Sequence, residues 1–261
     1  MSLHTPFDRD DVARRLAFIA RDAGDLLVSW RPETGRVETK PDGSPVSGAD
    51  RASEALILAG LAKAFPDIPV VSEENVESHG ALVAAQFFLV DPLDGTKAYL
   101  AGEPDFCVLI ALIRDGAPVA AAIDAPVPGV TYWVGESAFR SKNRAALIEE
   151  ATRLEASRIG GRIAVISRHH AGDESRKLCT DLGATVIRHE NSALKFIRLV
   201  EGAADFYPRP GRTMQWDVAA GDALLGALGG GVRTRDHKPL RYGFGELGWA
   251  NPGFIAYRTL P

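Results

Sequence analysis

The chain has 261 residues, 46% of them hydrophobic and 25% charged, which is typical of a soluble globular protein with one large domain or two tightly packed ones. A formal net charge of −4 without a basic tract argues against duplex nucleic acid as a partner. Its first residues contain no apolar targeting segment, and no run is long enough to cross a bilayer, so we expect a cytoplasmic protein.

The first half of the chain contains two helical patterns followed mainly by strand patterns. Apolar residues recur every three or four positions over residues 7–30, which predicts an amphipathic helix. A short strand is predicted at 37–40, and a second helix over 50–65. Further strands are predicted at 70–72, 87–90, 106–113, 118–125 and 130–134.

The second half alternates regularly between strand and helix. A polar segment at 141–161 is interpreted as the joint between an N-terminal half, 1–140, and a C-terminal half, 141–261. Alternation of this kind predicts an α/β half, so the whole chain is expected to be a layered α/β protein with an antiparallel-rich first half and a βαβα second half. The strands are predicted at 163–166, 184–187 and 204–207, and the helices at 174–182, 193–201 and 216–228.

The sequence DPLDGT at 91–96 directly follows a predicted buried strand. Ligand sites in α/β sheets lie at the carboxyl ends of strands. Asp91 and Asp94 are three residues apart across the corner made by Pro92, and both can point to one position. Two carboxylates, together with the Leu93 carbonyl, suit Mg²⁺ or Mn²⁺ better than zinc.

The same motif allows a second interpretation. Gly95 and Thr96 could open a helical turn whose backbone N–H groups bind a phosphate. Alternatively, the motif is an Asx-turn that only closes the strand, because Asp-Gly is a common turn signal.

Three further acidic positions stand at the ends of predicted elements. Glu73, with Glu74, follows a strand, and Asp50 and Asp217 open helices. Each has an ordinary alternative: a surface charge for Glu73 and an N-terminal cap for the two aspartates. If these carboxylates converge, they require cations to offset their repulsion, and a multi-metal site of this kind suits phosphoryl chemistry.

Together these motifs resemble the inositol-monophosphatase-like family of metal-dependent, often lithium-sensitive phosphatases. The resemblance covers nearly the whole chain and includes the motifs KPDGSPV at 40–46, Ala49-Asp50, Ser72-Glu73-Glu74, DPLDGT at 91–96 and WDVAAG at 216–221.

Within that family, five segments are most similar to the CysQ-type 3'(2'),5'-bisphosphate nucleotidases, enzymes of sulfur metabolism that remove the 3'-phosphate of 3'-phosphoadenosine 5'-phosphate. Ala98 and Tyr99 depart from that pattern, which usually has Glu and Phe. The five segments are Lys97, Ser167 to His170, Ser192 to Phe196, Tyr207 to Arg209, and Asn251 to Phe254.

The resemblance implies a role for each matching residue. The implied ligands of two or three Mg²⁺ ions are Glu73, Asp91, Asp94, Asp217 and the Leu93 carbonyl. Asp50 and Thr96 would orient and deprotonate the attacking water, and Gly95 and Thr96 would hold the scissile phosphate. The implied contacts to the nucleotide are Ser192, Lys195, Arg209 and one of His169 and His170, with His170 preferred.

The residues alone leave other interpretations open for the basic side chains. Lys195 could lie on a solvated helix face, and Arg209, between two prolines, on a surface turn. A zinc site at His169 and His170 is rejected because adjacent side chains in an extended segment diverge.

We therefore predict a Mg²⁺-dependent phosphomonoesterase with one compact catalytic unit that uses a metal-activated water. The resemblance implies that its substrate is 3'-phosphoadenosine 5'-phosphate, from which it would release the 3'-phosphate to give AMP. The first half would carry most metal ligands, and the second half Asp217 and the substrate contacts. Alternatives are an inositol, sugar or histidinol phosphate as substrate, or a binding protein with a decayed site. The resemblance also allows a homodimer, although no interface pattern is visible.

Overall fold

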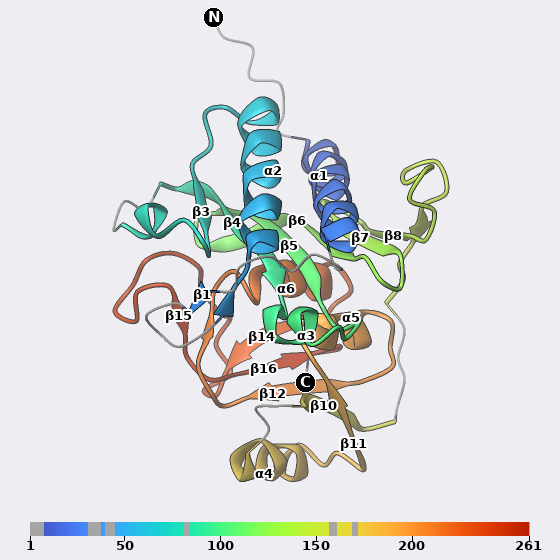
Figure 1. Cartoon of the computed structure of the whole chain (residues 1–261). Coiled ribbons are helices and arrows are strands. Elements are labelled where there is room, and N and C mark those ends of the chain that lie inside the picture. The colour runs from blue at the N-terminus through green and yellow to red at the C-terminus, as the bar shows by residue number, and fades with distance from the viewer. Residues whose placement is uncertain are drawn as a thin grey trace, which may run out of the picture.

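Two β-sheets separate three layers of helices (Figure 1). The computed structural model describes residues 8–30, 38–39, 45–80, 84–156, 161–168 and 172–260. The helices are α1 (Arg9–Trp30), α2 (Gly48–Ala64), α3 (Thr96–Leu100), α4 (Asp173–Asp181), α5 (Leu194–Val200) and α6 (Ala219–Ala227), together with the 3₁₀ turn η1 (Val76–His79).

Within the described ranges, the first sheet has seven strands in the order β3-β4-β5-β6-β7-β8-β9. Neighbouring strands are antiparallel except β3 and β4, which are parallel. The strands are β3 (Val70–Ser72), β4 (Gln86–Asp94), β5 (Cys107–Arg114), β6 (Ala117–Ala125), β7 (Val130–Val134), β8 (Ala138–Ser141) and β9 (Thr152–Arg153).

A second sheet of five described strands has the order β11-β10-β12-β16-β14. Its first three strands are parallel, and β16 pairs antiparallel with both β12 and β14. The strands are β10 (Ile163–Ser167), β11 (Val186–Glu190), β12 (Phe206–Arg209), β14 (Gly231–Thr234) and β16 (Phe254–Tyr257); two small pairs are β1 (Glu38–Thr39) with β2 (Pro45–Val46), and β13 (Thr213–Met214) with β15 (Ala250–Asn251).

Alternation along the central strands explains the layering. In β4, Phe88 and Val90 pack with α1 and α2, whereas Phe87 and Leu89 pack with α5 and α6. Both faces of this sheet are therefore buried, which is why its strands read as continuous apolar runs. Helices α5 and α6 lie between the two sheets, and α4 covers the outer face of the second one (Figure 1).

The expected fold class is confirmed, with differences at several element ends. Helix α2 begins two residues earlier than predicted because Ser47 forms a capping box with Asp50. Helix α6 begins at Ala219, and the residues predicted as its first turn form a separate turn. The predicted joint at 141–161 contains β9, which pairs with β8 and extends the first sheet to Arg153. The predicted division into two halves at residue 140 stays a proposal.

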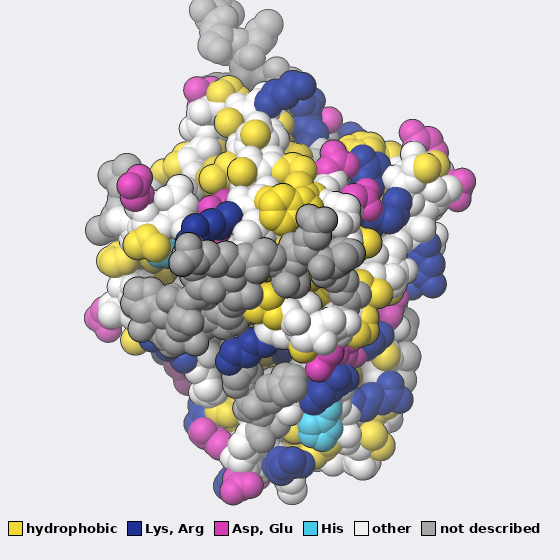
Figure 2. All heavy atoms as spheres, viewed as in Figure 1, with side chains coloured by type: hydrophobic (Ala, Val, Ile, Leu, Met, Phe, Trp, Pro, Cys, Tyr) yellow, Lys and Arg dark blue, Asp and Glu magenta, His cyan; other side chains and the backbone are white. Residues whose placement is uncertain are grey.

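Charged and hydrophobic side chains can be compared on one face of the molecule (Figure 2). The described side chains on the face drawn in Figure 2 mix acidic and basic groups with hydrophobic ones between them. Within the described ranges, none of the helices combines the length and hydropathy that a membrane span requires.

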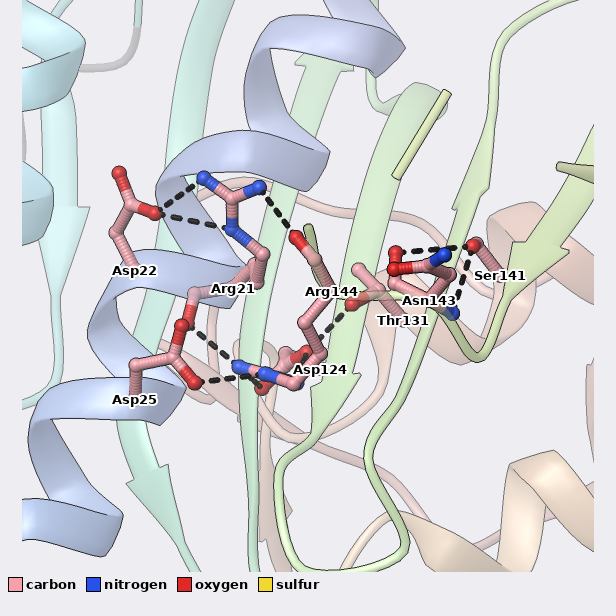
Figure 3. A network of polar contacts seen from close by, with 8 residues as sticks. All are labelled: Arg21, Asp22, Asp25, Asp124, Thr131, Ser141, Asn143 and Arg144. Atoms are coloured by element: carbon pink, nitrogen blue, oxygen red, sulfur yellow. Dashed lines mark hydrogen bonds and ion pairs between the residues drawn. The ribbon is translucent and has the colours of Figure 1, made fainter. Parts of the chain in front are cut away.

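A buried ion pair fixes α1 and the segment after β8 to the first sheet (Figure 3). Asp124 of β6 is fully buried and accepts hydrogen bonds from Thr131 at 2.6 Å and from the Arg144 guanidinium at 2.9 and 3.2 Å. Arg144 also donates to Asp25 and to the Arg21 carbonyl, both on α1. A buried carboxylate that lost this arginine would be left without its charge partner.

Burial raises the pKa of Asp124 from 3.8 to about 6, although Arg144 and Thr131 oppose the shift. Because the pKa in the folded state exceeds the unfolded value, this carboxyl makes folding less favourable as the pH rises from about 4 to about 6. Above that range the carboxyl is ionised and depends most on Arg144.

We therefore expect Arg144→Ala to lower the free energy of unfolding by about 3 kcal/mol at pH 8 and by clearly less at pH 5, where Asp124 is largely protonated. Urea denaturation at the two pH values measures the difference. Arg153→Ala is the control, because its ion pair with Glu155 at 3.9 Å is exposed. An equal loss at both pH values for Arg144→Ala would contradict this account.

Candidate active site

A cavity of about 560 Å³ is lined by residues of both halves of the chain. The first half contributes Glu73 and the end of β4 with the start of α3, and the second half contributes residues that adjoin β10, α5, β12 and α6. Nearly all of the predicted site residues that the structure describes line this one cavity. His169 and His170 lie outside the described residues.

Three carboxylates meet at the cavity wall. Glu73, Asp91 and Asp217 each offer one oxygen atom, and these oxygen atoms all lie within 4.8 Å of one another. The pairing of β3 with β4 aligns the first two, because Ser72 lies opposite Val90 and the Glu73 N–H donates to the Val90 carbonyl at 3.1 Å. Hard oxygen ligands at this spacing suit a divalent cation such as Mg²⁺ or Mn²⁺.

The pKa of Asp217 reflects both the burial of this carboxyl group and its repulsion by the neighbouring carboxylates. Desolvation raises the pKa of Asp217 well above its ordinary value, and the nearby charges of Glu73 and Asp94 raise it further. Asp217 is not the N-terminal cap of α6, because the helix begins at Ala219 and Val218 holds the cap position. The Asp217 carboxylate instead accepts a hydrogen bond from the Met214 N–H at 2.8 Å. A bound cation would remove the repulsion.

Asp94 also lines the cavity, but it is not one of the three residues whose oxygen atoms lie within 4.8 Å of one another. The register of β4 against β5 is interrupted between Asp91 and Asp94, where Pro92 has no N–H to donate to the ladder. The Asp94 carboxylate accepts from the Ala193 N–H and from the Cys107 thiol at 3.5 Å. Burial raises the pKa of Asp94, and the charge of Lys195 opposes that shift.

Asp50 and Thr96 form a hydroxyl–carboxylate pair. Both the Asp50 carboxylate and the Leu93 carbonyl lie 3.1 Å from the Thr96 Oγ1, which can donate its proton to either. Asp50 is not the cap of α2: Ser47 holds that position, and its N–H donates to Asp50 at 2.8 Å. Burial raises the pKa of Asp50, although its hydrogen bonds to Ser47 and Thr96 oppose the shift.

Gly95 makes the corner that places Thr96. Its φ is +98°, a left-handed conformation that glycine adopts without strain, and a Cβ here would lie 2.7 Å from the Asp105 carbonyl oxygen. The helix α3 begins at the next residue, which agrees with the interpretation that Gly95 and Thr96 open a helical turn.

Lys195 is buried rather than solvated, so a place on an exposed helix face is excluded. It is 5% exposed, donates to the Ser192 carbonyl and lies 5.3 Å from the centre of the Tyr207 ring. Desolvation lowers the pKa of Lys195 to about 8, although the charge of Asp94 opposes the shift. The Lys195 ammonium group therefore lies near Asp94, an expected metal ligand that lines the same cavity.

Arg209 ends β12 and lines the same cavity, so it is not on an external turn. One of its terminal nitrogen atoms donates to the Arg212 carbonyl at 3.3 Å. Its Nε is buried and has no hydrogen-bond partner among the described residues. Ser192 lines the same cavity and has a positive φ of +51°.

Cys107 and Asn191 were not among the predicted site residues. Cys107 is fully buried, and its sulfur lies 3.5 Å from the Asp94 carboxylate and 3.6 Å from the Ser192 hydroxyl. Asn191 lines the cavity and donates to Glu103 and Asp105. The continuous apolar run of β5 places Cys107 in the core but gives no sign that the core adjoins the site there.

Comparison with known proteins agrees with this geometry. The family model described as "Inositol monophosphatase family" matches residues 8–258. The 3'(2'),5'-bisphosphate nucleotidase CysQ of Escherichia coli strain K12 is 37% identical over 243 residues, which cover 90% of this chain and 95% of that protein. The corresponding protein of Haemophilus influenzae is 30% identical over 249 residues, covering 94% and 92%.

Among solved structures, CysQ of Bacteroides thetaiotaomicron has a TM-score of 0.81 at 30% identity, covering 98% of this chain and 99% of that one. The suppressor protein SuhB of Bartonella henselae has a TM-score of 0.75 at 27% identity, covering 95% and 93%. With a matching family model over almost the whole chain and an acidic cluster in a shared cavity, the protein belongs to the inositol monophosphatase family and is a phosphatase of that family.

Proposed function

We propose that the protein hydrolyses the 3'-phosphate of 3'-phosphoadenosine 5'-phosphate, giving AMP and phosphate, and that it requires Mg²⁺. The observation that carries this proposal is the convergence of Glu73, Asp91 and Asp217 within 4.8 Å in a cavity that also contains Lys195 and Arg209. The acidic group supports metal-dependent chemistry, and the basic side chains support a substrate with more than one phosphate.

Glu73, Asp91 and Asp217 would hold the metal, with Asp94 and the Leu93 carbonyl completing the oxygen ligands. A divalent ion bound here would lower the pKa of a bound water and offset the charge of the phosphoryl group. Asp94 is held on one side by the Ala193 N–H and the Cys107 thiol, which fixes its carboxylate at the edge of the cavity.

The pair formed by Asp50 and Thr96 would orient the attacking water. Thr96 Oγ1 lies 3.1 Å from two acceptors, the Asp50 carboxylate and the Leu93 carbonyl. When it donates to Asp50, its oxygen can accept a hydrogen bond from the attacking water, and the proton that the water loses would pass through this hydroxyl to the Asp50 carboxylate. Asp50 is itself fixed by two hydrogen bonds from Ser47. The backbone at Gly95 and Thr96 would then bind the scissile phosphate at the start of α3.

The second phosphate of the substrate requires a cation that can still donate hydrogen bonds. Lys195 and Arg209 both act on the charge of Asp94, but the Lys195 ammonium group also donates to the Ser192 carbonyl. Arg209 lines the cavity with a buried Nε that has no hydrogen-bond partner among the described residues. Guanidinium groups bind phosphate oxygens through two parallel hydrogen bonds, so we assign this contact chiefly to Arg209.

The nucleotide is favoured over inositol 1-phosphate for two reasons. Relatives named as bisphosphate nucleotidases are 30–37% identical to this chain over at least 90% of its length. In addition, the neutral ring of inositol would offer the Arg209 guanidinium no second phosphate to bind, so this group would interact only with the carboxylates Asp94 and Asp217.

Asp91→Asn tests the metal site. The asparagine Oδ1 can still accept from the Leu93 N–H, which donates to Asp91 at 3.1 Å, so the fold should be retained. We expect phosphatase activity to fall on the order of 10³-fold, because a ligand charge is lost. In chelator the variant should be at least as stable as the unmodified protein, since one repelling charge is gone.

Thermal unfolding with and without Mg²⁺ provides the second readout for this prediction. Mg²⁺ should raise the melting temperature of the unmodified protein but not that of Asp91→Asn, because only the form that binds the ion is stabilised by it. Asp67→Asn, at an exposed position, is the matched control. Full activity after exhaustive chelation, or equal Mg²⁺ stabilisation of both proteins, would rule out this metal site.

Arg209→Gln tests the choice of substrate. We expect kcat/KM for 3'-phosphoadenosine 5'-phosphate to fall about 10- to 100-fold, the usual cost of a lost charge-assisted contact to phosphate. The value for inositol 1-phosphate should change much less, because that substrate has no second phosphate.

Steady-state phosphate release on both substrates measures this ratio. Arg188→Ala, which removes an exposed arginine of β11, is the control for a general change in charge. Equal losses on the two substrates would show that Arg209 supports the acidic cluster rather than the second phosphate. A preference of the unmodified enzyme for inositol 1-phosphate would replace the nucleotide with the alternative substrate class.

A further inference from the structure

His79 contacts both chain segments that carry Glu73 and Asp217, although it belongs to neither. Its Nε2 lies 2.7 Å from the Ser72 carbonyl oxygen, and because a carbonyl only accepts, this nitrogen is the protonated donor. Its ring stacks on Trp216, with centroids 4.9 Å apart and planes inclined by 24°. Ser72 directly precedes Glu73, and Trp216 directly precedes Asp217.

Trp249 completes the connection between the two halves of the chain. Its indole N–H donates to the His79 carbonyl at 3.1 Å, and its ring packs edge-on against Phe87 of β4 at 5.7 Å. Its own carbonyl accepts from the Gln215 N–H at 2.9 Å. The turn that precedes Asp217 is thus attached to η1 through both tryptophans.

The position of Trp216 depends on packing. The side chain is 3% exposed, and its indole nitrogen has no hydrogen-bond partner in the part of the chain that the structure describes. Removing the His79 imidazole would leave a gap beside the Trp216 ring, whose N–H has no hydrogen bond to a described residue that could keep the ring in place. The peptide of Asp217 would then be free to move away from Glu73, in the direction that their mutual repulsion favours.

We propose that His79 is a positioning residue for the acidic cluster: it fixes the distance between Glu73 and Asp217 and so keeps the site ready for a divalent cation. The inference rests on the proposed function in one respect, that this cluster binds the metal. Residues that orient metal ligands without touching the ion commonly change its affinity by ten- to a hundredfold, and an indirect contact should lie at the lower end of that range.

Titration of the full chain with Mn²⁺ alone, followed by electron paramagnetic resonance, tests the proposal without using turnover. We expect His79→Ala to weaken Mn²⁺ binding about tenfold. His79→Phe, which keeps a ring on Trp216 but loses the donor to Ser72, should weaken it by a smaller factor. In assays, more Mg²⁺ should be needed for half-maximal activity, whereas kcat at saturating Mg²⁺ should change little.

Val76→Ala is the matched control, because Val76 lies on the same turn and is 74% exposed. If Mn²⁺ binding by the unmodified protein does not depend on Asp91, the metal assignment fails and this inference fails with it. If it depends on Asp91 but His79→Ala binds as tightly as Val76→Ala, only the role of His79 is overturned. Should His79→Ala not fold, the same comparison with His79→Phe decides.

Discussion

Repulsion among carboxylates is the constraint around which this protein is organised. Glu73, Asp91 and Asp217 bring oxygen atoms within 4.8 Å of one another, and Asp94 lies close enough to raise the pKa of Asp217 further. At such distances in a partly desolvated cavity, like charges destabilise the fold unless rigid elements hold them and cations balance them. The parallel pair of β3 and β4 holds the first two, and the turn before α6 holds the third.

The layered core provides the necessary rigidity. The central strands of the first sheet are buried on both faces, by α1 and α2 on one side and by α5 and α6 on the other. Asp91 is therefore attached to a strand, β4, that is packed on both faces. The same packing places Asp50 of α2 beside Thr96, so the hydroxyl–carboxylate pair and the acidic cluster share one scaffold.

Most helices and strands could be predicted from the sequence, because apolar residues recur every three or four positions in the helices and form continuous runs in the strands. The acidic site residues could be predicted because each of them stands at the end of a predicted element. The start of α6 at Ala219 was not predicted. The turn from Met214 to Asp217 is closed by a hydrogen bond from the Met214 N–H to the Asp217 carboxylate, and the spacing of apolar residues gives no information about such a bond. Nor did the sequence place Lys195 against Asp94: a lysine in a helical pattern resembles a solvated one until the packing is known. The roles of Cys107 and His79 arise from contacts between distant segments, for which no local signal exists.

The distribution of the cluster over the chain has a consequence for folding. Glu73 and Asp91 come from the first sheet, whereas Asp217 arrives with a segment that is synthesised much later. Contacts of large sequence separation form slowly, because a long loop must be closed before they contribute any stability. Of the three carboxylates, only Glu73 and Asp91 can approach each other before residue 217 is synthesised, and the strongest repulsion arises only when Asp217 joins them. The complete acidic cluster accordingly exists only when these distant segments have come together, and the cation binding proposed for it would report on completed folding.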